Sequence, residues 1–133
     1  MADRSRVATH LWFRGEAKEA AEFYVSILPE ARIIDSFTFH NSGPDGKSSF
    51  TSVTFEFGGQ VYMVLDGSPF PFNPATSIFI ACDTQEEIDR LWAALVQDGQ
   101  PQRCGWLTDR FGLCWQIAPR ELAVMLGDEG EGG

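Results

Sequence analysis

Thr9-His10-Leu11-Trp12-Phe13-Arg14-Gly15 is a short apolar stretch that runs straight into a helical pattern ending at Phe23-Tyr24. The same arrangement recurs in the second half, where Ser77-Ile78-Phe79-Ile80-Ala81-Cys82-Asp83 runs into a helical pattern ending at Leu91-Trp92. A strand that feeds an amphipathic helix twice, at a constant offset, indicates an internal structural repeat. Two such units packed together leave a cleft between them, and we expect the function of the chain to lie in that cleft.

The first half predicts a strand, a helix and three further strands. Apolar residues alternate over 7–13, as in a half-buried strand, and return at helical spacing over 16–28. Strand-like stretches then cover 31–40, 49–57 and 60–66, and glycine-containing turns join them. The order of this half is therefore β-α-β-β-β.

The second half repeats this order in abbreviated form. A strand over 76–82 precedes a helix whose start, Thr84-Gln85-Glu86-Glu87, fits a capping box. Stretches 103–108 and 113–118 are predicted to form one hairpin, so only two clear strands follow this helix. Residues 121–126 are predicted to form a closing helical turn.

The predicted architecture is an α+β fold of one domain, residues 1–133. Two tandem βαβββ modules are expected to form a curved, partly open mixed sheet around the cleft. Module one covers 7–66 and the abbreviated module two covers 76–118, with the proline-containing linker 67–75 between them. The tail 119–133 ends in glycine and acidic residues, and we expect its last residues to be mobile.

The composition argues against several classes of partner. A formal net charge of −9 disfavours binding to nucleic acid and to anionic membrane surfaces, since both require basic patches. No apolar run approaches the length of a membrane span, and the N-terminus lacks the apolar core of a signal peptide. The three cysteines, Cys82, Cys104 and Cys114, contain no Cys-x-x-Cys pair, which predicts a reducing, cytoplasmic environment.

The chain resembles the vicinal-oxygen-chelate superfamily through its two tandem β-α-β-β-β modules and through one stretch of module two, Gly105-Trp106-Leu107-Thr108-Asp109-Arg110-Phe111-Gly112-Leu113-Cys114-Trp115-Gln116. That superfamily includes glyoxalase I, extradiol dioxygenases and bleomycin-resistance proteins. Within it the chain is most similar to the PhnB-like branch, through residues 11–13, 19–24, 59–67 and 77–89. The branch often carries the label 3-demethylubiquinone 3-methyltransferase. A methyltransferase needs a glycine-rich loop after a parallel strand to hold S-adenosylmethionine, and no such loop follows any predicted strand, so we reject that activity.

The resemblance also implies a homodimer, because members of the superfamily commonly pair. The stretch between Gly99 and Gly105 is shorter than is usual in the branch, and the C-terminus stops soon after Leu126. The shortened second module leaves a sheet edge that association would cover.

In metal-using members of the superfamily, each module gives one ligand from the start of its first strand and one from its last strand. Overlaying the repeat puts Ala8 (or Thr9) and Thr76 (or Ser77) at the first-strand positions. The glycines before the last strands put Met63 and Gln116 at the others. This set does not suit a divalent cation, so we expect no metal site and no cofactor.

The favoured hypothesis is a metal-free binding module that holds a small, partly aromatic or amphipathic molecule. An aromatic wall with a few polar groups is typical of small-molecule pockets, and alternation places Trp12 beside His10. The residues expected to bind the ligand are His10, Trp12, Met63, Thr76, Ile78, Cys114 and Gln116.

The alternative is a divalent-metal-dependent lyase, isomerase or oxygenase. It would use His10 and Gln116 together with a third, unidentified ligand. Acid–base chemistry through His10 and Asp66 is a further option, although Asp66 also fits a carboxylate that caps a turn.

Overall fold

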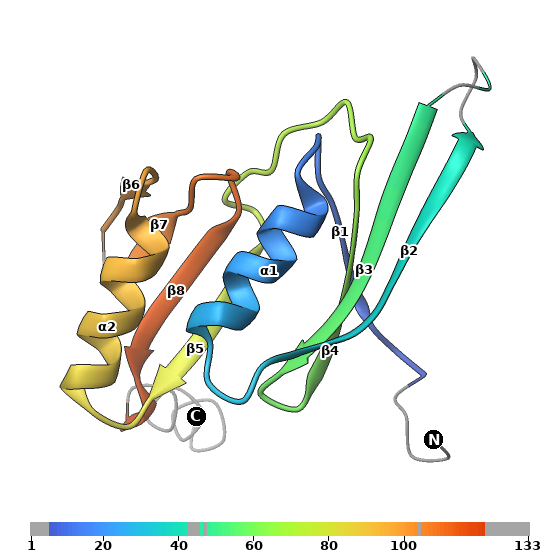
Figure 1. Ribbon diagram of the computed structural model, residues 1–133. Coiled ribbons are helices and arrows are strands. Elements are labelled where there is room, and N and C mark those ends of the chain that lie inside the picture. Colours follow the sequence, from blue (N-terminus) through green and yellow to red (C-terminus); the bar gives the residue numbers. More distant parts are fainter. Residues whose placement is uncertain (1–5, 43–45, 47, 104, 122–133) are drawn as a thin grey trace, which may run out of the picture. The chain divides into compact units, whose positions relative to one another are not determined.

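The computed structural model describes residues 6–42, 46, 48–103 and 105–121, and it divides the chain into two compact units (Figure 1). Unit 1 is Met1–Pro71 and unit 2 is Phe72–Gly133. Among the described residues, each unit contains one four-stranded sheet and one α-helix longer than two turns. No helix in these described ranges is long and apolar enough to cross a membrane.

Unit 1 has the order strand, helix, strand, strand, strand, as predicted. Its elements are β1 (Thr9–Trp12), α1 (Ala17–Ile27), β2 (Arg32–Ser42), β3 (Ser48–Phe57) and β4 (Gln60–Leu65). The strands form sheet A in the order β1-β4-β3-β2, with β1 parallel to β4 and the remaining neighbours antiparallel. The two outer strands of sheet A are therefore β1 and β2.

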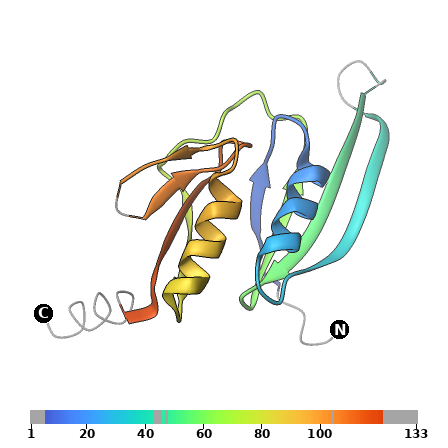
Figure 2. The same cartoon turned by 60° about the vertical axis from the view of Figure 1, so that its left-hand side comes forward.

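The core of unit 1 lies between α1 and one face of sheet A (Figure 2). Small residues on α1, with Tyr24, allow the helix to approach the sheet closely, and the ring centroids of Tyr24 and Phe55 are 6.1 Å apart. The side chains that fill this core are Phe13, Ala17, Ala20, Ala21, Tyr24, Val53, Phe55 and Val64. Burial of each large side chain contributes about 1.5–3 kcal/mol.

The β3–β4 hairpin turns at Gly58-Gly59, where both residues have positive φ angles of 59° and 78°. This conformation is the one that two-residue hairpins require, and glycine adopts it without steric cost. The glycine pair therefore builds a hairpin inside an antiparallel part of the sheet, as the sequence predicted.

Unit 2 repeats the arrangement with shorter strands. Its elements are β5 (Ser77–Cys82), α2 (Gln85–Val96), β6 (Gln100–Pro101), β7 (Trp106–Thr108) and β8 (Cys114–Pro119). They form sheet B in the order β5-β8-β7-β6, and β5 is parallel to β8. The predicted capping box is present, since the Thr84 hydroxyl accepts from the backbone N–H of Glu87 at 3.1 Å.

The α+β class and the two-module βαβββ arrangement are confirmed, with the strands arranged as two four-stranded sheets. The expectation of only two strands after the second helix needs one correction, because β6 adds a third strand of two residues. A stretch of two residues that includes a proline shows no alternation of apolar residues, so no pattern in the sequence indicates this strand. The predicted helical turn over 121–126 and the tail to residue 133 lie largely outside the described residues.

Candidate functional site

Sheet A carries several predicted site residues on the face opposite α1. His10 and Met63 are register partners on β1 and β4, and Met63 in turn partners Thr54 on β3. The side chains of strand residues alternate, so these three and Trp12 share the face that α1 does not cover. We call this surface, which contains His10, Trp12, Thr54 and Met63, the open face of sheet A.

Trp12 is the anchored aromatic group of the open face. Its indole Nε1 donates a hydrogen bond to the backbone oxygen of Asp66 at 3.0 Å, and its ring lies 6.3 Å from that of Phe70. The side chain nevertheless remains 41% exposed, and Met63 is 37% exposed. A large aromatic surface is thus fixed in orientation and still available for contact.

Asp66 directs its carboxylate to the start of α1. The backbone N–H of Ala17 donates to Asp66 Oδ1 at 2.7 Å, whereas Glu16, the residue at the N-cap, provides no side-chain cap. The first N–H groups of a helix have no partner within the helix, and a carboxylate there also favours the helix dipole. Of the two interpretations of Asp66, this geometry favours the capping role.

In unit 2, Cys114 and Gln116 lie on the face of sheet B that is opposite Trp115. Gln116 Nε2 donates to Ser77 Oγ at 2.8 Å, and Cys114 Sγ lies 3.7 Å from Thr108 Oγ1. The Thr108 hydroxyl also accepts from Gln102 Nε2 at 2.6 Å. This surface therefore carries uncharged hydrogen-bonding groups, of which the Cys114 thiol is buried and Ser77 and Gln116 are half-buried. We call it the open face of sheet B.

Ile78 and Thr76 are not on that face. Ile78 is the register partner of Trp115, which is fully buried, so it points to the side of sheet B that forms the core with α2. Thr76 lies before β5, where its backbone N–H donates to Asn73 at 3.4 Å.

The residues of β5 that do share the open face with Gln116 are Ser77, Phe79 and Ala81. Phe79 partners Gln116 just as His10 partners Met63, so the second copy of the repeat is shifted by one residue from the predicted overlay. A shift of one residue exchanges the two faces of a strand. Phe79 is 41% exposed and was missed, although its alternation with Ile78 and Ile80 was the available signal.

The side chains at the four superfamily ligand positions do not fit a divalent cation. In the register of the structure these positions hold Ala8, Met63, Ser77 and Gln116, which offer one hydroxyl, one amide and one thioether. Hard cations are held chiefly by carboxylate and carbonyl oxygens and borderline cations by imidazole, and one amide with one hydroxyl provides too few such donors. In the part of the chain that the structure describes, no group of three or more His, Cys, Asp or Glu side chains could hold a metal ion.

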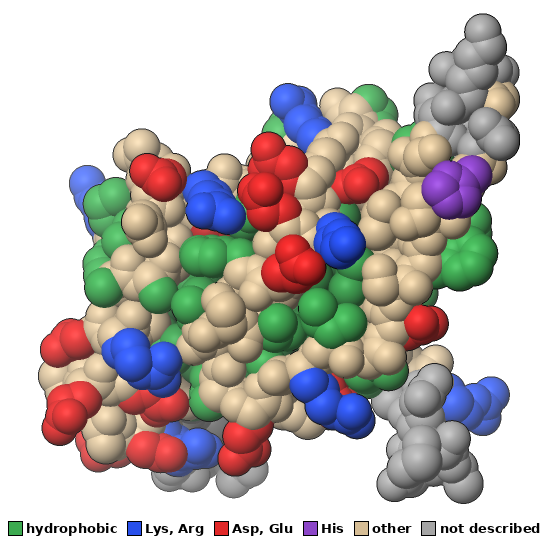
Figure 3. Space-filling view, in the orientation of Figure 1, with side chains coloured by type: hydrophobic (Ala, Val, Ile, Leu, Met, Phe, Trp, Pro, Cys, Tyr) green, Lys and Arg blue, Asp and Glu red, His purple; other side chains and the backbone are tan. Residues whose placement is uncertain are grey.

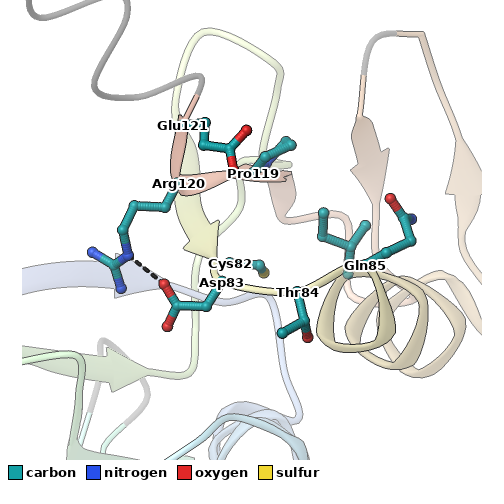
Figure 4. Close-up of a pocket in the computed structure, with 8 residues that line it drawn as sticks. Cys82, Asp83, Thr84, Gln85, Pro119, Arg120 and Glu121 are labelled. Atoms are coloured by element: carbon teal, nitrogen blue, oxygen red, sulfur yellow. Dashed lines mark hydrogen bonds and ion pairs between the residues drawn. The ribbon is translucent and has the colours of Figure 1, made fainter.

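A pocket of about 560 Å³ lies in unit 2, and none of the predicted site residues lines it (Figure 4). It is formed by the end of β5, the first turn of α2 and the end of β8, and an ion pair between Asp83 and Arg120 lies beside it. Hydrogen bonding to Arg120 lowers the pKa of Asp83, and burial, with the nearby Glu87 carboxylate, raises the pKa of Cys82 to about 11. A neutral, buried thiol is a poor nucleophile, so this cysteine is structural in character.

Comparison with known proteins identifies relatives along most of the chain. The family model described as "3-demethylubiquinone-9 3-methyltransferase" matches residues 5–118. The putative 3-demethylubiquinone-9 3-methyltransferase PhnB from Bacillus cereus is 34% identical, with a TM-score of 0.72, over 85% of this chain and 98% of its own.

More distant structures share the fold. Protein PA1353 from Pseudomonas aeruginosa is 23% identical with a TM-score of 0.65, over 87% of this chain and 98% of its own. The fosfomycin resistance protein FosX from Mesorhizobium loti is 14% identical with a TM-score of 0.61, over 93% of this chain and 98% of its own. No curated protein matches the sequence.

Proposed function

Because the chain belongs to the 3-demethylubiquinone-9 3-methyltransferase family, a PhnB-like branch of the vicinal oxygen chelate superfamily, we propose that it binds a small, partly aromatic molecule without a metal ion. The observation that carries this proposal is Trp12. Its ring is exposed on the open face of sheet A while its indole N–H is already bonded to the backbone at Asp66. A fixed aromatic surface binds a flat ligand with little loss of side-chain entropy.

The polar groups near this surface support a ligand with a few hydrogen-bonding atoms. His10 is exposed on the same face as Trp12, next to Met63, whose flexible thioether adapts to varied shapes. The open face of sheet B adds the amide of Gln116 and the hydroxyl of Ser77. A cleft to which both modules contribute residues stays a prediction. Variants on the open face of sheet A and on the open face of sheet B test the contribution of each module separately.

Methyl transfer has no support in the chain. The label of the family would require a loop for S-adenosylmethionine, and Gly58-Gly59 instead forms the β3–β4 hairpin turn. We therefore propose a role in binding, transport or resistance. The fosfomycin resistance proteins show that the fold occurs in drug resistance, which makes antibiotics a reasonable part of the ligand search.

The test is equilibrium binding against a panel of aromatic metabolites and antibiotics, with bleomycin and fosfomycin included. Tryptophan fluorescence of the wild-type protein screens the panel. Isothermal titration calorimetry then compares the affinity of Trp12→Ala with that of the wild type, because this variant lacks the main fluorescent reporter of binding. We expect Trp12→Ala to weaken binding by about tenfold or more, equivalent to about 1.4 kcal/mol. Trp92→Phe on α2 is the matched control and should bind as wild type does. A panel with no saturable ligand, or unchanged affinity in Trp12→Ala, would remove the proposal.

Elemental analysis separates this proposal from the metal-dependent alternative that uses His10 and Gln116. Protein purified without a metal-affinity tag should contain no stoichiometric zinc, nickel, iron or manganese, because the four ligand positions lack carboxylate and imidazole groups. Stoichiometric metal that is lost in His10→Ala would favour the lyase, isomerase or oxygenase. The measurement needs no knowledge of the substrate.

A further inference from the structure

The face of sheet A that carries Trp12 continues across all four strands of the sheet. Trp12 is the register partner of Leu65 on β4, Leu65 partners Ser52 on β3, and Ser52 partners Phe37 on β2. Register partners on neighbouring strands point to the same side of a sheet. These four residues therefore form one cross-strand row, which we call the Trp12 row, and its two ends lie three strand spacings or about 14 Å apart.

A pair of exposed aromatic rings stands at each end of the Trp12 row. At the β1 end, the ring of Trp12 lies 6.3 Å from that of Phe70, which is 65% exposed. At the β2 end, Phe37 and Phe39 are 57% and 45% exposed, and their rings meet edge to face with centroids 4.7 Å apart. Single apolar side chains on a surface are ordinary, whereas aromatic pairs grouped on one face mark a surface that contacts something.

The side chains between the two ring pairs stand out less from the sheet. Leu65 and Ser52 are half-buried, and so is Phe50, the register partner of Phe39. The ring of Phe50 lies against the backbone of Gly67, where an added Cβ atom would come to 2.5 Å from Phe50 Cε1. The lack of a side chain at Gly67 thus lets this ring lie close to the sheet. A flat molecule can rest on the middle of the row while its ends meet the exposed rings.

One long side of the Trp12 row is lined by hydrogen-bonding groups. Two residues along the strands, or about 7 Å away, lies a parallel row that we call the polar row: His10, Met63, Thr54 and Asp35. The opposite side of unit 1 differs, because α1 covers the sheet there and exposes acidic and basic side chains together (Figure 3). An aromatic surface with a few polar groups at its side is typical of a site for a small amphipathic molecule.

We propose that the ligand of the Trp12 site is an elongated, flat aromatic molecule that lies across the strands, from Trp12 to Phe37 and Phe39. This inference rests on the proposed function, because it takes Trp12 as the contact at one end, and it adds β2 as the contact at the other. The ligand spans about 14 Å, the distance between the outer strands, and places its hydrogen-bonding groups over the polar row. A compact ligand leaves one ring pair in water, whereas an elongated one removes apolar surface of both pairs from water and gains affinity.

Two probes that differ only in length test the proposal. They are para-hydroxybiphenyl and para-hydroxyterphenyl, which carries one more ring in line, and equilibrium dialysis with absorbance detection measures the affinity of each. The wild type should bind the longer probe about tenfold or more tightly than the shorter one. Phe37→Ala/Phe39→Ala should lose this gain and keep the wild-type affinity for the shorter probe, whereas Trp12→Ala should weaken the binding of both probes.

Two control variants separate loss of the rings from damage to β2. Phe37→Tyr/Phe39→Tyr keeps both rings and should retain the gain from length. Ser36→Ala lies on the other face of β2, since Ser36 partners the buried Val53, and it should bind both probes as the wild type does. The circular dichroism spectrum should be unchanged in every variant.

The outcomes distinguish a failure of this inference from a failure of the proposed function. The inference is wrong if the shorter probe binds through Trp12 and the longer one binds no better, if the double alanine variant keeps the gain, or if neither probe binds saturably. It is also wrong if the double alanine variant changes only the sedimentation coefficient of the chain, since the two phenylalanines then serve a contact between proteins. Unchanged affinity of Trp12→Ala for both probes counts against the proposed function itself.

Discussion

Asp109 is the polar residue around which the β7–β8 hairpin is organised. It is only 2% exposed, and its Oδ1 accepts from the backbone N–H groups of Phe111 and Leu113 while Oδ2 accepts from the indole of Trp115 at 2.9 Å. Trp115 is itself fully buried in the core of unit 2. The carboxylate therefore links the turn to the core.

Asp109→Asn should destabilise the fold, because an amide at Oδ2 would place an N–H group against the Trp115 N–H. We expect the free energy of unfolding to fall by about 1–3 kcal/mol in urea denaturation, the cost of a buried donor without an acceptor. Asp35→Asn is the control, since Asp35 is exposed and its carboxylate accepts from the neighbouring N–H of Ser36, and it should change stability by less than about 0.5 kcal/mol. Equal effects of the two substitutions would contradict this role of Asp109.

Cys82 should be an unreactive thiol at neutral pH. Its pKa is raised from 9.0 to about 11 by burial and then by the Glu87 carboxylate. The folded state thus holds the thiol proton more tightly than the unfolded state does. The resulting stability is present below pH 9 and is lost as pH rises towards 11.

Peptide-resolved alkylation with iodoacetamide measures the reactivity of this thiol. The alkylation rate at Cys82 should be slow at pH 8 and should increase up to about pH 11, and Glu87→Gln should move this pH profile of the rate to lower pH. Rapid alkylation of the folded protein at pH 8 would contradict the prediction.

At single residues, the sequence predicted the first module better than the second. Alternation placed His10 and Trp12 on one face, and the register with β4 agrees. The overlay of the two copies assigned Ile78 to the same kind of position, but that residue faces Trp115. Because strand side chains have a period of two, an error of one residue in the overlay changes the face while leaving the strand itself correctly predicted.

Among the elements, the two helices begin in different ways, and only one start is visible in the sequence. The start of α2 depends on neighbours, Thr84 and Glu87, whose spacing is a known capping pattern, and the structure confirms it. The start of α1 depends on Asp66, which comes from the far end of β4. No local pattern reveals a cap supplied by a strand that is distant in sequence.

Removing this distant cap should cost stability in unit 1. Asp66→Ala leaves the N–H of Ala17 without its acceptor and should lower the free energy of unfolding by about 1 kcal/mol. Asp66→Asn keeps an oxygen that can accept and should cost less, and the comparison by urea denaturation isolates the hydrogen bond. If Asp66→Ala were as stable as wild type, the capping interpretation would be wrong.

For the whole molecule, the net charge of −9 should make any pairing of two copies, which the sequence leads us to expect, sensitive to salt. Raising the ionic strength from roughly 0.01 M to 1 M shortens the Debye length from about 30 Å to about 3 Å and screens the repulsion between the acidic copies. The dissociation constant from sedimentation equilibrium should therefore decrease as salt is added. An association driven by attraction between opposite charges would weaken instead.

The tyrosine and tryptophan side chains are unevenly distributed between the two units. Both tyrosines, Tyr24 and Tyr62, belong to unit 1, whereas three of the four tryptophans, Trp92, Trp106 and Trp115, belong to unit 2. The fourth, Trp12, belongs to unit 1 and is 41% exposed. During heating, ultraviolet absorbance of tyrosine follows the melting of the N-terminal half, and indole emission chiefly follows the C-terminal half. Coincidence of the two traces is one of the standard criteria for a single cooperative transition. The natural chain thus carries an optical reporter of cooperativity in each half, with no dye attached.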